Sequence, residues 1–123
     1  MEDQIKQALA NGLTCDITTT GRTSGQPRRI EIWYLVIEGR TYITGTPGPR
    51  DWYANLLADP HMVFHVKEGA QADLPARATP ITDPAERRHV LGAVMRSNSW
   101  FRAQNYDLDS WVAASPLVEV VFE

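Results

Sequence analysis

Cysteine is almost missing from this sequence, in which Cys15 is the only one. A single cysteine excludes a disulfide within the chain, a CxxC motif and a cysteine-rich metal site. No apolar stretch approaches the length of a transmembrane helix, and the start MEDQIKQALANG is polar rather than signal-like. The net charge is only −3, which does not favour binding to nucleic acid or to an anionic membrane. We therefore expect a cytoplasmic protein with no nucleic-acid partner and no membrane segment, folded as a single domain over residues 1–123.

Recognisable catalytic motifs are also missing. The stretch GRTSG at residues 21–25 is not a nucleophile elbow, because Ser24 is displaced from the centre of a GxSxG, and it is not a GxxxxGK phosphate loop. His61 and His65 lie in an alternating segment, where four residues of strand span roughly 13 Å, too far for two ligands of one ion. We therefore expect no metal site. Cys15 has no identifiable base beside it and is expected to be a packed thiol. Any difficult chemistry should come from a bound cofactor.

Hydrophobic spacing and breaker residues predict about six strands and three or so short helices. The strands are expected at residues 13–20, 29–37, 41–44, 61–67, 72–81 and 117–122. The helices are expected at residues 2–11 and 50–58, in a segment that begins at Pro84, and in one or two turns at 107–114. The first three strands should form an antiparallel meander in which 29–37, the most apolar, crosses the core. This order predicts a mainly β fold, a small antiparallel barrel decorated with helices.

The stretch TTTGRTSGQPRR at residues 18–29 combines the features that an anionic ligand needs. It reads as a strand, a polar loop and a second strand. The loop offers guanidinium groups from Arg22 and Arg28, hydroxyls from Thr23 and Ser24, and glycines that allow backbone N–H groups to approach closely. A solvated hairpin turn with ordinary surface charges is the alternative. A nucleic-acid surface is not expected, because neighbouring arginines in a strand point to opposite faces.

Tryptophan is abundant for this length, and most of the aromatic residues should be core. Residues 97–106 differ, because Trp100, Phe101 and Tyr106 stand there among polar side chains that make a poor core segment. We expect an aromatic loop over a ligand pocket at this place.

Two motifs, TTxGRxSGxxR at residues 18–28 and WYxNLxAxP at residues 52–60, together resemble the deazaflavin-dependent nitroreductase family. The similarity runs from about residue 18 to residue 65 and includes the GTPG loop at 45–48, and the later helix and strand come in compatible order. That family shares the split β-barrel of pyridoxamine-phosphate-oxidase-like flavoproteins. The resemblance therefore implies this fold, the deazaflavin coenzyme F-420, and hydride transfer to a quinone, a nitroaromatic compound or an activated alkene.

The resemblance also implies roles for individual residues. The phosphodiester of the coenzyme tail would be held by Arg22, Thr23, Ser24, Gly25 and Arg28. The deazaflavin ring would lie against Gly45, Thr46, Pro47 and Gly48, with Asn55 as a structural or cofactor-side residue and Trp52 as a packing anchor. The substrate would meet Trp33, Trp100, Phe101 and Tyr106. Thr46 and Tyr106 are the candidates for catalytic hydrogen-bond donors that stabilise developing negative charge, and the proton would come from a tyrosine or from solvent.

Three departures from the family pattern limit what the resemblance implies. Thr23 occupies a position where lysine is common, the loop between Gly48 and Trp52 is short, and the substrate tyrosines are replaced by other aromatic residues or absent. The alternatives are an FMN-using reductase on the same fold and a non-catalytic protein that binds, stores or senses a deazaflavin or flavin. A homodimer is a further expectation, because split-barrel relatives often pair.

Overall fold

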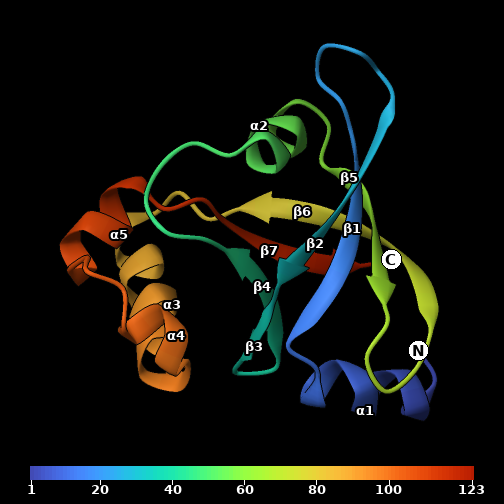
Figure 1. Cartoon of the computed structure of the whole chain (residues 1–123), viewed down its shortest axis with the longest axis horizontal. Coiled ribbons are helices and arrows are strands. Elements are labelled where there is room, and N and C mark those ends of the chain that lie inside the picture. The colour runs from blue at the N-terminus through green and yellow to red at the C-terminus, as the bar shows by residue number, and fades with distance from the viewer.

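All strands belong to one antiparallel sheet of seven strands in the order β2-β1-β5-β6-β7-β4-β3, as a computed structural model of residues 1–123 shows (Figure 1). The strands are β1 (Thr14–Thr20), β2 (Pro27–Trp33), β3 (Leu35–Ile37), β4 (Arg40–Thr44), β5 (His61–Val66), β6 (Ala72–Pro80) and β7 (Leu117–Phe122). The helices are α1 (Asp3–Asn11), α2 (Asp51–Ala58), α3 (Pro84–Ser97), α4 (Ser99–Arg102) and α5 (Leu108–Ala114). The sheet curls into a half-barrel, so the predicted mainly β barrel with short helices is confirmed.

The predicted strand at residues 29–37 is wrong in two respects. It is broken at Tyr34, and its two parts, β2 and β3, form the two edges of the sheet. The β1–β2 and β3–β4 pairs are antiparallel as predicted, but no continuous meander links them. The strand also does not cross the core, since most of β2 is exposed, and Ile30 and Trp33 are 38% and 40% exposed to solvent. Apolar composition therefore did not reveal the position of this strand in the sheet.

Tyr34 explains the break. Its side chain is buried, its ring packs edge-on against Phe64, and its hydroxyl donates a hydrogen bond to the carbonyl oxygen of Leu9 at 2.8 Å. Burial raises the pKa of this hydroxyl to about 12. Its backbone N–H donates to Leu13 rather than to a neighbouring strand of a continuous ladder. These contacts tie the turning point of the chain to the end of α1.

The core consists of two clusters of buried side chains. One fills the half-barrel and includes Cys15, Ile17 and Phe64, each fully buried. Burial raises the pKa of the Cys15 thiol to about 12, which confirms the predicted packed thiol. The second cluster joins α3 and α5 to the β3–β4 side of the sheet and includes Trp111 and Leu91, both fully buried.

The starts of the later helices follow from local sequence. The carboxylate of Asp83 accepts a hydrogen bond from the backbone N–H of Glu86, and Pro84 occupies the first turn, as the sequence predicts. Asn98 caps α4 in the same way. Part of the aromatic segment at residues 97–106, which was expected to be a loop, is therefore a short helix. None of the five helices has the length and apolar character that crossing a membrane requires.

Candidate functional site

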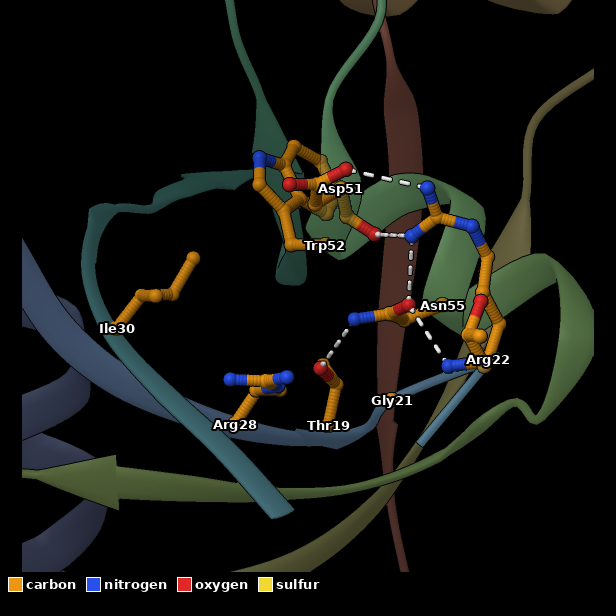
Figure 2. A pocket seen from close by; sticks show the side chains of 9 residues that line it. Thr19, Gly21, Arg22, Arg28, Ile30, Asp51, Trp52 and Asn55 are labelled. Carbon is orange, nitrogen blue, oxygen red and sulfur yellow. Dashed lines mark hydrogen bonds and ion pairs between the residues drawn. The ribbon is translucent and has the colours of Figure 1, made fainter. Parts of the chain in front are cut away.

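A pocket of about 470 Å³ lies between the β1–β2 hairpin and the first turns of α2 (Figure 2). Its walls come from two parts of the chain that are about thirty residues apart, the hairpin at residues 19–30 and the helix start at residues 51–55. The residues that line it are Thr19, Gly21, Arg22, Thr23, Arg28, Ile30, Asp51, Trp52 and Asn55. The fold therefore brings the two sequence motifs together around one cavity.

The hairpin loop is shaped by hydrogen bonds within residues 21–26. The backbone N–H of Gly21 donates to the carbonyl oxygen of Gln26, and that of Gly25 donates to Gly21, each at 2.8 Å. A Cβ atom at Gly21 would lie 2.5 Å from Oγ of Ser24, so a larger residue at this position would displace the Ser24 hydroxyl. Ser24 accepts a hydrogen bond from the backbone N–H of Gln26. Of the five predicted tail-binding residues, Arg22, Thr23 and Arg28 line the pocket, whereas Ser24 and Gly25 do not.

Asn55 joins the hairpin to α2. Its side chain is 5% exposed, and its Oδ1 accepts hydrogen bonds from the backbone N–H of Arg22 at 3.1 Å and from Nη1 of Arg22 at 2.9 Å. Its Nδ2 donates to Oγ1 of Thr19 at 3.3 Å. Figure 2 shows Asn55 between these two hairpin residues. The buried amide thus fixes both the backbone and the guanidinium group of Arg22.

The two arginines of the pocket differ in their partners. Nη2 of Arg22 forms an ion pair with Oδ1 of Asp51 at 3.2 Å. The guanidinium group of Arg28 forms no hydrogen bond or ion pair within the chain, although it faces the same pocket. The next residue, Arg29, instead pairs with Asp16 at 3.0 Å on the other face of β2, as strand alternation predicts. Arg28 is therefore the positive charge that an anion in this pocket could neutralise.

The GTPG loop at residues 45–48 lies outside this pocket and is held by Arg50. Nη2 of Arg50 donates to the carbonyl oxygen of Thr46 at 3.1 Å and to its Oγ1 at 2.8 Å. Because a hydroxyl group both donates and accepts, this contact leaves the hydroxyl hydrogen of Thr46 free to be donated to another group. Gly48 has a φ of +127°, a conformation that glycine adopts readily, and its N–H donates to the carbonyl oxygen of Ala114 at 3.1 Å.

Arg87 supports this loop from the other side. Its side chain is 9% exposed and has no acidic partner. Its guanidinium group donates to the carbonyl oxygens of Val112 and Ile81 at 2.8 Å and of Ser115 at 2.6 Å. These contacts fix the end of α5, and therefore the carbonyl of Ala114 that holds Gly48. Behind the loop, Gly48 and Ser115 line a second cavity of about 560 Å³.

The aromatic residues predicted to meet a substrate fall into two environments. The rings of Trp33 and Trp100 are stacked, with centroids 6.4 Å apart and planes inclined by 19°, and both side chains are substantially exposed. Tyr106 is 50% exposed, packs against Trp111 and forms no hydrogen bond through its hydroxyl. Phe101 is buried, and its ring packs edge-on against Trp100. Phe101 thus supports the exposed aromatic pair from beneath.

The two histidines that were considered as metal ligands have other partners. His65 is buried and shares hydrogen bonds with Asp73 at 2.7 Å and with the hydroxyl of Thr18 at 2.6 Å. His61 is hydrogen-bonded to Asp59 at 2.9 Å. No cluster of three or more histidine, cysteine, aspartate or glutamate side chains has the arrangement of a metal site.

Several residues of the site were missed by reasoning from the sequence. Thr19 and Ile30 were treated only as strand residues, and Arg50 and Asp51 only as the start of a helix. The signal for the latter two was their charge directly before the WYANL motif, at the end of a loop expected to face the cofactor. Arg87 carried no such signal, because its partners are backbone carbonyls.

Comparison with known proteins supports the resemblance that the two motifs indicate. The model of the F420H(2)-dependent quinone reductase family matches residues 5–110. A conserved hypothetical protein from Mycobacterium tuberculosis has a similar structure, with a TM-score of 0.74 and 21% identity over 100% of this chain and 81% of that one. An F420 reductase is also similar, with a TM-score of 0.70 and 16% identity over 100% of this chain and 95% of that one. A putative pyridoxamine 5'-phosphate oxidase from Listeria innocua has a TM-score of 0.69 and 15% identity over 98% of this chain and 92% of that one. At these identities the structural likeness shows the fold.

Proposed function

The chain belongs to the F420H(2)-dependent quinone reductase family, a family of oxidoreductases, and from that premise we propose that it binds coenzyme F-420 and reduces a small electrophilic acceptor. The tail phosphodiester would be held in the pocket between the β1–β2 hairpin and α2. The ring would lie against Gly45, Thr46, Pro47 and Gly48. The observation that carries the proposal is the guanidinium group of Arg28, which faces this pocket without a partner of its own.

The pocket fits the anionic tail of this coenzyme on three counts. Arg28 offers a complete set of donors, and the side chain of Thr23 adds a hydroxyl group on the same wall. Arg22 is held in place by Asn55, so it can present its remaining donors without first being ordered. Gly21 lines the same wall, and because it has no Cβ atom it leaves the space that the Ser24 hydroxyl needs in this loop.

When bound in its reduced form, coenzyme F-420 supplies a hydride. The protein residues would position the acceptor and stabilise the negative charge that develops on it. Thr46 is suited to donate its hydroxyl hydrogen, since Arg50 already donates to the oxygen of that hydroxyl. Tyr106 has an exposed hydroxyl with no partner in the chain and is a second donor candidate. The proton that completes the reduction would come from Tyr106 or from solvent.

A planar acceptor suits the aromatic surface better than a bulky one. Trp33 and Trp100 present nearly parallel, half-exposed rings, which favour stacking with a quinone or a nitroaromatic ring. We therefore expect a quinone to be the preferred acceptor, as in the family name, with nitroaromatic compounds and activated alkenes as further candidates.

A fluorescence titration with coenzyme F-420 tests the binding site. The R28A variant should bind about ten- to a hundredfold more weakly, since a charge-assisted contact is worth roughly 1.5–3 kcal/mol. R29A is the matched control, because it removes the same charge from the neighbouring residue on the opposite face of β2. Equal losses in the two variants would show that the tail does not bind at Arg28. Oxidation of the reduced coenzyme by menadione or a nitroaromatic compound then tests catalysis, and binding without turnover would favour a storage or sensing role.

A further inference from the structure

Asp51 gives the pocket an unusual charge distribution for a phosphate site. Its carboxylate lies among the lining residues and forms the ion pair with Nη2 of Arg22 at 3.2 Å. The side chain of Asp51 is 90% exposed, and Arg22 is the one hydrogen-bond partner of its carboxylate. The pocket therefore contains two guanidinium groups and one carboxylate, and only the charge of Arg28 is unbalanced.

We infer that Asp51 makes the pocket selective for a monoanionic phosphodiester over a dianionic phosphate monoester. This inference rests on the proposed function, because it concerns the group that the pocket would hold. A phosphodiester carries one negative charge, which Arg28 balances. A phosphate monoester has its second pKa near 6 and carries close to two charges at neutral pH. Its second charge would lie beside the carboxylate of Asp51 or would have to displace that carboxylate from Arg22.

Two features of the pocket strengthen this selectivity. The residue after Arg22 in the loop is the neutral Thr23, so the loop supplies no additional positive charge to balance the carboxylate of Asp51. The Oδ1 atom of Asn55 takes up another of the donors of Arg22, which leaves fewer of them for a highly charged ligand. A monoester would thus face a pocket in which part of the donors of the second arginine is already taken, and its charge is already balanced by Asp51.

Asp51 also lies in the first turn of α2, where an acidic side chain stabilises a helix. That structural role predicts that removing the charge of Asp51 changes the stability of the protein. It does not predict that the effect on binding depends on the charge of the ligand. The two roles can therefore be separated by ligands that share one ring and differ only in their phosphate group.

The experiment compares D51N with wild type in titrations with riboflavin, FMN and the monomethyl ester of FMN, and with coenzyme F-420 itself. Because Asp51 is exposed to water, where two unit charges a few Å apart interact only weakly, removing its charge should strengthen binding by about threefold per unit of ligand charge. D51N should therefore gain about tenfold for FMN, about threefold for its methyl ester and nothing for riboflavin. D109N is the matched control, since Asp109 forms a similar exposed pair with Arg88 far along the chain.

The outcomes separate this inference from the proposed function. Failure of the wild-type protein to bind coenzyme F-420 would reject the proposed function. If the coenzyme binds, equal gains of D51N for FMN and its methyl ester, or a gain for riboflavin, would overturn the selectivity role of Asp51. Binding of coenzyme F-420 with no measurable binding of the methyl ester would also overturn it, because the ring rather than the charge would then decide. Gains in the predicted order, absent in D109N, would support it.

Discussion

Replacing Asn55 with alanine tests how the candidate site is built. The variant loses two hydrogen bonds from Arg22 and one to Thr19, at 3.1, 2.9 and 3.3 Å. The bond from the guanidinium group of Arg22 is charge-assisted, the second comes from the backbone N–H of Arg22, and the bond to Thr19 is the longest and weakest. Since the side chain of Arg22 is 42% exposed, water can replace part of what is lost. We therefore expect a loss of about 2–3 kcal/mol in the free energy of unfolding.

Thermal and urea unfolding measure this loss. For a chain of this length, 2–3 kcal/mol corresponds to a fall in Tm of roughly 6–12 °C. The T19V variant should lose about 1–2 kcal/mol, less than N55A, because it leaves the buried Nδ2 of Asn55 without an acceptor but keeps Asn55 bound to Arg22. N105A is the control, since Asn105 is exposed and forms no side-chain hydrogen bond.

The N55A variant should also weaken anion binding, because Arg22 would no longer be held toward the pocket. A double-mutant cycle with R22A isolates the coupling between the two side chains. A loss of stability in N55A no larger than that of N105A would refute the reasoning, because the hairpin would then be held by other contacts. Additive effects of N55A and R22A would refute the specific pairing of their side chains.

Three further predictions concern residues outside the pocket. Hydrogen bonds from Thr14 and Leu13 hold the pKa of Glu68 below its ordinary value of 4.5. Ionised Glu68 therefore stabilises the fold above pH 4.5, and this stabilisation is lost as the pH falls through the lowered pKa. E68Q should give a shallower loss of stability in acid, and an unchanged acid slope in urea unfolding would contradict this. Cys15, whose thiol pKa is raised to about 12 by burial, should react with a thiol reagent at pH 8 only after unfolding, and fast labelling of the native protein would disprove its burial. R87M should lose roughly 3 kcal/mol or more in urea unfolding, because it leaves several buried carbonyls without donors, and a near-neutral effect would show that water replaces the guanidinium group.

Signals that act over a few residues were enough to predict much of this fold. The start of α3 at Pro84 follows from a capping aspartate and a proline, and the β1–β2 hairpin follows from glycine and proline between two β-prone segments. The opposite orientations of Arg28 and Arg29 follow from strand alternation alone. Local chemistry decides each of these features, so no knowledge of the rest of the chain was needed.

Features that depend on distant partners could not be predicted in this way. The break at Tyr34 is fixed by a hydrogen bond to Leu9, and the role of Arg87 is fixed by carbonyl groups of another helix. The contact of Asp51 with Arg22 joins residues that are 29 positions apart. Each of these side chains looks ordinary in the sequence, since its function depends on which groups the fold places beside it.

Strand β2 shows why the error about its burial bears on function. Its apolar composition favoured a core strand, yet it is an edge strand on which Ile30 and Trp33 stay partly exposed and Arg28 has no partner. An exposed apolar edge is normally a liability for a folded protein, because it invites association. On the pocket side of this edge, Arg28 and Ile30 place a free guanidinium group near an apolar side chain, a combination that suits the anionic tail of a ligand. Arg28 fits poorly with a purely structural strand and is therefore the residue that the proposed tail site requires, whereas Trp33 lies on the opposite face of β2 with Arg29 and does not belong to that site.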